Sequence, residues 1–433
     1  MLGKIAQTTD QKKGFMHTLA QLRSGELKGI KRLTLSENLT SFPEEIFELA
    51  ESLEILDLSN NLLSSIPDEI SRLTKLKIAF FSNNRFVTLP SSFKGCEELY
   101  MLGFKANQIE EFDEDILPHS ISWLILTDNK LKKLPRSIGN LHKLQKCALA
   151  GNQIEKLPNE MAACQNLELL RLSANQIDEI PSWLLSLPKL SWLAFSGNPC
   201  SGSQRFELQE IAYEALEIKE LLGSGASGDI FKAYSSKHEQ EVALKLFKGA
   251  ITSDGYAHDE MNACMSVGEH PNLIKVLAKI EGDEKLGLLL EYIPAIYQNL
   301  GFPPDFETCT RDTFEEGRVF NIQTISEVAK AIASAAAHLH SRGLMHGDLY
   351  AHNILINDED KCYLGDFGAA SFYEPHRKEY EKIEVRAFGC LLEDMLTLCS
   401  TKEGEAYLAL EELRGRCMDE NRDKRPLFSE MAF

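Results

Sequence analysis

A motif of about 23 residues returns eight times in the first half of this chain. Aligned on the segment LEILDLSNN, its copies start at Ile30, Leu53, Leu76, Leu99, Ile121, Leu144, Leu167 and Leu190. An Asn follows each start at the same distance: Asn38, Asn61, Asn84, Asn107, Asn129, Asn152, Asn175 and Asn198. A repeat of this length predicts one small unit stacked many times, with each copy burying its apolar side against the next.

The spacing within each copy has a physical reason. In L-x-x-L-x-L the leucines point inward from a short strand, and an inward Asn bonds backbone groups that would otherwise be buried without partners. Pro residues share a later phase, at which the chain is expected to bend around the convex side: Pro67, Pro90, Pro135, Pro158 and Pro181, with Asp113 in one irregular copy. Residues 30–200 resemble the leucine-rich-repeat superfamily, which implies a solenoid of eight repeats.

Residues 1–29 are predicted to cap the first repeat. An amphipathic helix over residues 10–29, with Phe15, Leu19 and Leu22 on one face, would cover the first apolar layer. A helix lying on a membrane surface is the alternative, but its apolar face would be small.

Apolar residues also occupy the strand positions that alternate with the inward leucines and so face the concave side. They are Ile55, Ile78, Phe80, Met101, Trp123, Ile125, Leu169 and Trp192. Because successive repeats place them side by side, we predict an exposed surface for a protein partner. Single apolar residues without a function are the alternative, since these are normal on protein surfaces.

The repeat stops near residue 200, and a short polar connection, residues 201–210, leads to a second set of motifs. The first is G-x-G-x-x-G at Gly223, Gly225 and Gly228, a weak signal alone. Lys245 follows on a predicted strand, where it shares one face with Ala243. Glu260 comes next on a predicted helix, as a plausible partner for the Lys245 ammonium group.

Two further motifs complete the set. HGDLYAHNIL contains Asp348 and Asn353, and LGDFGAA contains Asp366. In this order and spacing the motifs resemble the eukaryotic-type protein kinases over residues 211–433. The resemblance implies a bilobal α+β domain, with an N-lobe near 211–293 and a C-lobe near 294–433, after an α/β repeat solenoid.

The resemblance also implies roles for individual residues. ATP phosphates would lie under the glycine loop and on Lys245, oriented by Glu260, while Asn353 and Asp366 hold Mg²⁺ and Asp348 receives the proton of the attacking hydroxyl. The adenine pocket would consist of Ile230, Ala243, Leu355, the gatekeeper Leu290 and the hinge residues Glu291 and Ile293. The predicted function is an ATP- and Mg²⁺-dependent protein kinase, of Ser/Thr type, whose repeats recruit a protein.

Several positions depart from the kinase pattern. Gly347 replaces the Arg that normally meets an activation-loop phosphate, so activity is not expected to need phosphorylation of Ser371, Tyr373 or Tyr380. Tyr350 and His352 replace the Lys-containing pattern of Ser/Thr kinases and do not match tyrosine kinases. H-G-D-L-x-x-x-N also resembles aminoglycoside and choline-type phosphotransferases, so a small-molecule kinase remains an alternative, as does a pseudokinase scaffold.

Charge and cysteine content bear on partners and compartment. The formal net charge of −19 argues against nucleic acid as a partner, and no apolar stretch is long enough to cross a membrane. The ten cysteines are scattered without a C-x-x-C pair, and we expect most to be small buried hydrophobes. We expect a cytoplasmic protein, although a secreted effector that acts in a host cytosol would look the same.

Overall fold

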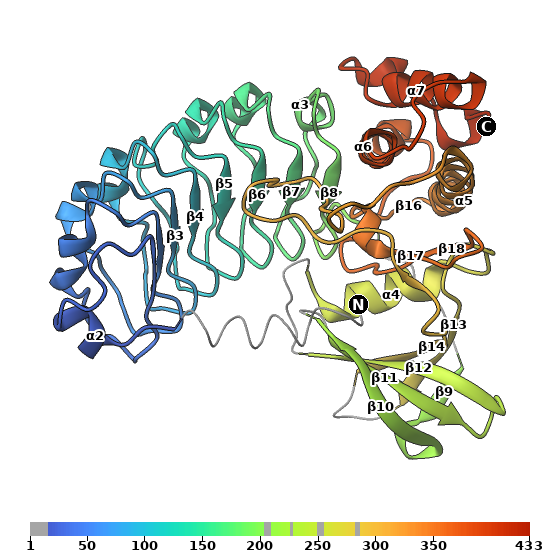
Figure 1. Cartoon of the computed structure of the whole chain (residues 1–433), viewed down its shortest axis with the longest axis horizontal. Coiled ribbons are helices and arrows are strands. Elements are labelled where there is room, and N and C mark those ends of the chain that lie inside the picture. Colours follow the sequence, from blue (N-terminus) through green and yellow to red (C-terminus); the bar gives the residue numbers. More distant parts are fainter. Residues whose placement is uncertain (1–15, 203–208, 226–227, 249–254, 282–285) are drawn as a thin grey trace. The chain divides into compact units, whose positions relative to one another are not determined.

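The computed structural model describes residues 16–202, 209–225, 228–248, 255–281 and 286–433 (Figure 1). They fall into two compact units. One holds residues 16–187 and Asn198–Cys200, and the other holds Pro188–Gly197 and the described part of Ser201–Phe433. Among the described residues, no helix has the length and apolar character that crossing a membrane requires.

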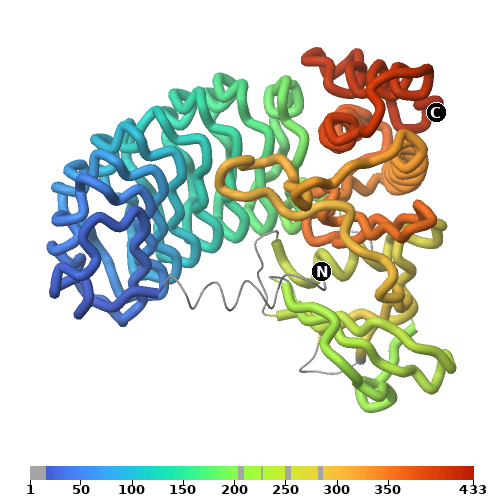
Figure 2. The backbone as a smooth tube through the Cα atoms, viewed as in Figure 1, coloured from blue at the N-terminus to red at the C-terminus, as the bar shows by residue number. Residues whose placement is uncertain are grey.

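The repeats form short parallel strands on successive turns of the chain, which Figure 2 shows as a regular coil. Each strand starts two residues after a predicted repeat start, and its central residue, such as Leu56 or Leu124, is fully buried. The sheet order follows the chain: β1 (Arg32–Thr34), β2 (Ile55–Asp57), β3 (Ile78–Phe80), β4 (Met101–Gly103), β5 (Trp123–Ile125), β6 (Lys146–Ala148), β7 (Leu169–Arg171) and β8 (Trp192–Ala194). The leucine-rich-repeat prediction for the fold is confirmed.

Short helices form the opposite side of most turns, and proline sets where most of them begin. All five predicted Pro positions, together with Pro43, are N-cap residues with φ between −66° and −70°, a value that the proline ring imposes. The helices are α2 (Leu19–Arg23), η1 (Glu44–Leu49), η2 (Asp68–Arg72), η3 (Ser91–Gly95), η4 (Arg136–Asn140), η5 (Asn159–Ala163) and α3 (Ser182–Leu185). The predicted bend at these prolines is confirmed.

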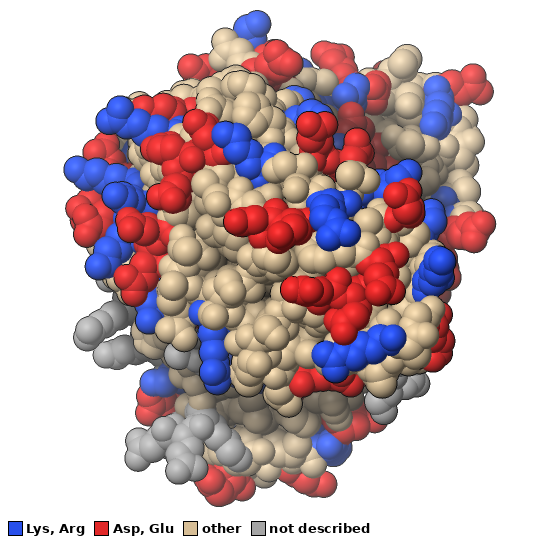
Figure 3. All heavy atoms as spheres, turned by 90° about the vertical axis from the view of Figure 1, so that its left-hand side faces the viewer, with Lys and Arg blue, Asp and Glu red and all other residues tan. Residues whose placement is uncertain are grey.

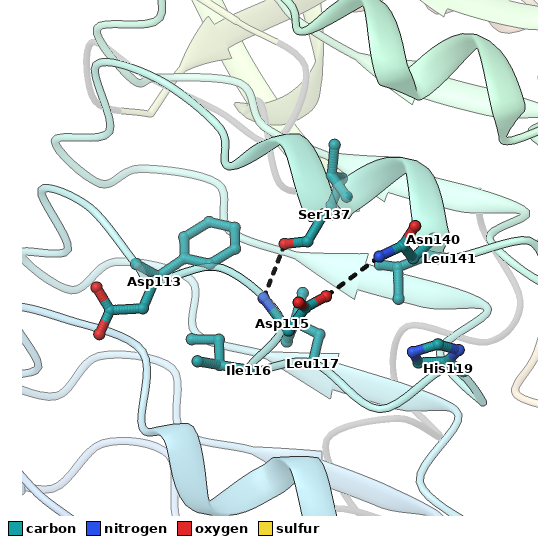
Figure 4. A pocket seen from close by; sticks show the side chains of 10 residues that line it. Asp113, Asp115, Ile116, Leu117, His119, Ser137, Asn140 and Leu141 are labelled. Carbon is teal, nitrogen blue, oxygen red and sulfur yellow. Dashed lines mark hydrogen bonds between the residues drawn. The ribbon is translucent and has the colours of Figure 1, made fainter.

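The irregular fourth repeat is fastened to the next repeat by polar contacts instead of its own helix. Figure 4 shows Asp115 (φ 56°) between Ser137 and Asn140: its N–H donates to Ser137 Oγ at 2.9 Å, and Asn140 Nδ2 donates to its carboxylate at 3.1 Å. The neighbouring Glu114 carboxylate accepts the N–H groups of Arg136 and Ser137 at 3.0 and 2.7 Å. These bonds satisfy the free N–H groups at the start of η4.

Seven of the eight motif Asn residues form the predicted ladder. Asn129 is typical: its Nδ2 donates to Phe104 O at 2.9 Å and to Leu126 O at 3.0 Å, and its Oδ1 accepts from Ile109 N at 3.0 Å. Asn38 is the exception, so the prediction is wrong there. It is exposed with φ 56°, because the first repeat places it in the left-handed turn that Asn60 occupies in the next repeat.

The N-terminal helix is shorter than predicted. Residues 1–15, including Phe15, lie outside the described residues, and the helix covers only Leu19–Arg23 of the predicted 10–29. Thr18 and Gln21 form a capping box at its start. The helix ends before Gly25 and Gly29, both at positive φ, which propagating helix does not allow. Leu22 and Leu27 are buried, as a cap on the first repeat requires.

The concave positions are less exposed than predicted. Ile78, Met101, Leu169 and Trp192 expose 3% or less, so the predicted exposed surface is wrong for these four; Ile55, Phe80, Trp123 and Ile125 stay partly exposed. Parallel register is one cause, because it sets Ile78 beside Met101 and Met101 beside Trp123, and neighbours of this size cover one another. The Lys146 ammonium group also covers the Trp123 ring, 4.0 Å from its centroid.

Charged side chains of both signs are interspersed on the face drawn in Figure 3. Some pair across repeats: the Glu54 carboxylate lies 2.9 Å from Lys31 Nζ and 2.7 Å from Lys77 Nζ, residues of the repeats on either side. Hydrogen bonds from Lys31 and then Lys77 lower the pKa of Glu54 to about 2.

The second unit begins with a six-stranded sheet and one helix. The strand order is β10-β11-β12-β14-β13-β9, antiparallel except for the β13–β9 pair. The bounds are β9 (Glu210–Ala212), β10 (Leu216–Ser224), β11 (Gly228–Ser235), β12 (Gln240–Phe247), β13 (Val276–Glu281), β14 (Gly287–Glu291) and α4 (Ala257–Ser266). Ile211, Val242, Leu244 and Leu289 are among the buried side chains of its core.

The rest of this unit is mainly helical. α5 (Ile322–Ser341) starts at Asn321, whose side chain accepts from Thr324 N at 2.8 Å, and its apolar face is buried. The remaining elements are β15 (Gln298–Asn299), β16 (Leu344–Met345), β17 (Ile354–Ile356), β18 (Cys362–Leu364), β19 (Ser371–Phe372), α6 (Lys378–Thr397), α7 (Glu405–Cys417), η6 (Tyr213–Ala215), η7 (Ala351–Asn353), η8 (Arg422–Lys424) and η9 (Phe428–Glu430). Two lobes, a sheet lobe and a helical lobe, confirm the predicted fold class.

The cysteines behave as predicted. All ten are free, and nine of them are buried, with Cys200 partly exposed. Burial raises the pKa of the Cys96 and Cys164 thiols to about 11, so these thiols stay protonated and unreactive at neutral pH.

Candidate active site

The glycine motif forms the hairpin between β10 and β11. Gly225 N–H donates to Gly228 O at 2.9 Å, which closes the turn; Ala226 and Ser227 at its tip lie outside the described residues. Gly228 has no space for a side chain, because a Cβ there would lie 2.3 Å from the Leu246 carbonyl oxygen. The third glycine of the motif is thus required by close packing of β11 on β12.

Lys245 on β12 forms an ion pair with Glu260 on α4. Both residues are buried, exposing 8% and 2%. Burial disfavours the ammonium ion, but the carboxylates of Glu260 and then Asp366 outweigh it, so the pKa of Lys245 is raised. Lys245 is therefore a permanent cation held inside the site, at the place where the sequence analysis put it.

The residues predicted to form an adenine pocket lie on strands of both lobes. Ile230 pairs with Lys245 across β11 and β12, and Ala243 pairs with Leu290 across β12 and β14. Leu355 lies on β17, in the other lobe. Ala243 is buried and the other three are partly exposed.

The predicted hinge residues Glu291 and Ile293 lie at the end of β14 and just after it. The Glu291 N–H donates to Lys275 O at 2.9 Å, directly before β13. The assignment of hinge backbone groups to a nucleotide stays a prediction.

Asp348 and Asn353 contact each other in the loop after β16. Asn353 Nδ2 donates to the Asp348 carbonyl at 2.9 Å and to its carboxylate at 3.0 Å. Because Asn353 Nδ2 bonds Asp348, the side-chain oxygen Oδ1 of Asn353 points away from Asp348. Asp348 remains partly exposed, whereas Asn353 is buried. Asn353 thus fixes the orientation of the Asp348 carboxylate.

Asp366 follows β18 with φ 58°, a strained conformation for Asp that is common at functional sites. The two predicted metal ligands are joined through the backbone, because Gly365 N–H donates to Asn353 O at 3.0 Å. One carboxylate and one amide oxygen suit Mg²⁺, which usually takes one or two protein ligands and completes its shell with phosphate oxygens and water. Among the described residues, no group of three or more His, Cys, Asp or Glu side chains is placed to hold a metal ion.

Glu384 on α6 binds the backbone of the loop that contains Asp348. Its carboxylate accepts the N–H groups of His346 at 3.1 Å and Gly347 at 2.6 Å, and it lies 2.8 Å from His340 Nε2. Burial opposes the charged form, but His340, His346 and the Gly347 N–H group outweigh it, so the pKa of Glu384 is lowered. The sequence showed Glu384 only as a substitute for an Asp, without its partners.

Asp312 is a site residue that the sequence analysis missed. Its carboxylate lies 2.7 Å from His352 Nδ1 and accepts the Ala351 N–H group, so it holds the loop between Asp348 and Asn353. Burial opposes protonation of His352, but the Asp312 carboxylate outweighs it and raises the pKa of His352. No local sequence signal marks Asp312.

The hydroxyls expected in the segment after Asp366 are buried. Ser371, Tyr373 and Tyr380 expose 0%, 7% and 3%. Ser371 Oγ accepts the Phe195 N–H at 2.9 Å, and the Tyr373 hydroxyl lies 2.8 Å from His340 Nδ1. These side chains serve in packing, and another kinase has no access to them in this conformation.

Comparison with known proteins agrees with this geometry. Residues 216–423 match the protein kinase domain family, and residues 51–109 match the leucine rich repeat family. The chain therefore contains a leucine-rich-repeat region followed by a protein kinase domain.

Individual relatives share the kinase part at low identity. A probable myosin light chain kinase of Dictyostelium discoideum is 29% identical over 170 residues, 37% of this chain and 32% of the relative. Fibroblast growth factor receptor 1 of Xenopus laevis is 27% identical (43% and 25%), and Aurora kinase B of Mus musculus is 26% identical (37% and 44%). The chain thus spans a third or less of the first two of these relatives.

A solved leucine-rich-repeat protein of Leptospira interrogans also matches. It is 26% identical, with a TM-score of 0.35 over 42% of this chain and 52% of that chain.

Proposed function

We propose that this chain is an ATP- and Mg²⁺-dependent protein kinase, with Ser or Thr as the first acceptor to test. The observation that carries the proposal is the joint presence of the buried Lys245–Glu260 ion pair and the Asp348–Asn353 contact. A fixed cation for phosphates, a fixed carboxylate for the hydroxyl and two metal-binding oxygens are what phosphoryl transfer requires.

The kinase resemblance supplies the proposed roles, and the contacts described above support them. Lys245 would bind the α- and β-phosphates, under backbone N–H groups of the loop with Gly223, Gly225 and Gly228. The acceptor hydroxyl oxygen bonds to the γ-phosphorus as the bond to the β–γ bridging oxygen breaks and ADP leaves, while Asp348 takes the hydroxyl proton. Mg²⁺, held by Asn353 Oδ1 and Asp366, would neutralise charge on the phosphate oxygens.

The repeats are proposed to bind a protein substrate or regulator. Support comes from the partly exposed concave residues Phe80 and Trp123, since aromatic side chains often anchor interfaces. The ten free cysteines support a reducing compartment such as the cytoplasm.

The test uses the purified full chain with labelled ATP, Mg²⁺, a pool of proteins and a panel of small-molecule acceptors. Wild type should label protein, and Asp348→Asn should lose at least about a hundredfold in rate while still binding ATP. Asp358→Asn, an exposed Asp ten residues further along, is the matched control and should keep full activity. Label only on small molecules would support the phosphotransferase alternative, and nucleotide binding without transfer would support the scaffold.

A further inference from the structure

The segment Pro188–Gly197, which contains β8 of the last repeat, belongs to the same compact unit as the kinase domain. Buried polar side chains hold its backbone and Ser191. Arg425 Nη2 donates to Pro188 O and Arg386 Nη1 to Ser191 Oγ, each at 2.7 Å, in addition to the bond from Phe195 N–H to Ser371 Oγ. Arg425, Arg386 and Ser371 expose 8% or less, so each of these bonds joins the segment to a buried side chain of the kinase domain.

Trp192 carries the contact with the catalytic loop. It exposes 1%, and its ring stacks on that of Tyr350 with centroids 4.4 Å apart and planes inclined by 5°. Its indole N–H donates to Leu349 O at 3.1 Å. Leu349 and Tyr350 directly follow Asp348, so Trp192 fixes both the backbone and the side chain next to the proposed base.

The loop is held from the other side as well. The Tyr350 ring packs on His352 with centroids 5.0 Å apart, and His352 bonds Asp312. The row Trp192–Tyr350–His352–Asp312 thus spans the loop from Asp348 to Asn353. Each member is a side chain with few rotatable bonds, which makes the row stiff.

Gly347 fits this arrangement. A Cβ at position 347 would lie 2.8 Å from Leu193 O on β8 and 2.5 Å from Ala369 O, and its φ is 73°. The departure from the kinase pattern at position 347 therefore leaves room for the backbone of β8.

We propose that Trp192 is a positioning residue of the kinase reaction, supplied by the last leucine-rich repeat. The inference rests on the proposed function. Support for catalysis is favoured over inhibition because the same structure has the Lys245–Glu260 ion pair formed, Phe367 packed on His346 with centroids 5.0 Å apart, and Asp348 partly exposed. Trp192 acts through the loop and does not touch ATP.

The test compares full-chain Trp192→Phe and Trp192→Ala with Trp183→Ala. Trp183 is the matched control: it lies on α3, bonds Asn159 Oδ1 at 3.2 Å and is partly exposed. We expect kcat to fall about tenfold or more in Trp192→Ala and less in Trp192→Phe, which keeps a ring on Tyr350 but loses the bond to Leu349. KM for ATP should change less than about twofold, since Lys245 and Glu260 are untouched. Trp183→Ala should match wild type.

Amide hydrogen exchange provides a readout that does not need activity. In Trp192→Phe, residues 346–353 should exchange faster while α5 keeps its protection. Unchanged kcat and unchanged exchange in Trp192→Phe would overturn the proposal, as would a rise in kcat, which would mark the contact as inhibitory. Wild-type protein without any transfer would contradict the proposed kinase function instead, and the exchange comparison would still decide whether Trp192 orders the loop.

Discussion

Asn129→Ala should lower the free energy of unfolding of the repeat unit by about 3 kcal/mol. Asn129 exposes 7%, and its three shortest side-chain hydrogen bonds join backbone groups of its own and the preceding repeat. Alanine fills less space and bonds none of them.

The magnitude follows from what each group retains. Ile109 N–H would lose Asn129 Oδ1, and a buried unpaired donor costs about 1–3 kcal/mol. The two carbonyls are better protected: Phe104 O keeps Asn107 Nδ2 at 3.1 Å, and Leu126 O keeps Asn152 Nδ2 at 2.9 Å. Each of these two carbonyls then loses one of its two side-chain hydrogen bonds, and each loss should cost about 0.5–1 kcal/mol of stability.

Urea unfolding of the full chain, followed by tryptophan fluorescence, measures the effect. Trp123 in the adjacent strand reports on these repeats. With a slope of about 2–3 kcal/mol per molar urea, the midpoint should fall by about 1 M. Asn38→Ala is the control: because Asn38 is exposed, only the strain of alanine at φ 56° should count, about 1 kcal/mol. Equal midpoints for the two variants would refute the ladder as a source of stability.

Three further predictions concern other parts of the chain. Gly347→Ala should lower the thermal unfolding midpoint of the kinase unit several-fold more than Gly317→Ala. Both glycines have positive φ, but a Cβ at position 347 would meet backbone oxygens, whereas a Cβ at position 317 would meet open space. Glu54→Gln should lower the unfolding midpoint at pH 7 but not near pH 2. The pKa of Glu54 is about 2 in the folded protein and about 4.5 in the unfolded chain. The stability that the carboxylate contributes is therefore complete above pH 4.5 and is lost as the pH falls toward 2. Phe80→Ser with Trp123→Ser should abolish capture of a protein substrate by the repeats without changing ATP binding, and equal capture would exclude this surface.

The fold was predictable where local sequence sets the structure. The repeat starts, the inward Asn and the bends at Pro67 and its equivalents each depend on a few neighbouring residues. The kinase motifs likewise predict a strand for Lys245 and a loop for Asp348, because motifs in this order are typical of one fold. The prediction for Asn38 was wrong because a shift of one residue in the first repeat places Asn38 in the left-handed turn instead of in the ladder.

The remaining site features depend on contacts between distant segments. Asp312 and His352 lie 40 positions apart and Trp192 and Leu349 lie 157 apart, with no periodicity linking them. Strand alternation predicted a face for Trp192, but it cannot predict which distant residues bury the side chain, and Trp192 exposes only 1%. The exposure predicted for Ile78 and Met101 failed for the same reason.

The Asn ladder has a direction, and the direction matters while the chain is being made. Asn61 accepts from Leu39 N and donates to Leu35 O, both in the repeat before it, and Asn198 likewise serves Ile177 N and Leu172 O. As a ribosome extends the chain, the turn of each repeat therefore gains its partners only when the following repeat has emerged. During translation, each repeat can therefore complete its hydrogen bonds only after the next repeat has been synthesised. Asn198 forms the last of these bonds just before the kinase domain is synthesised.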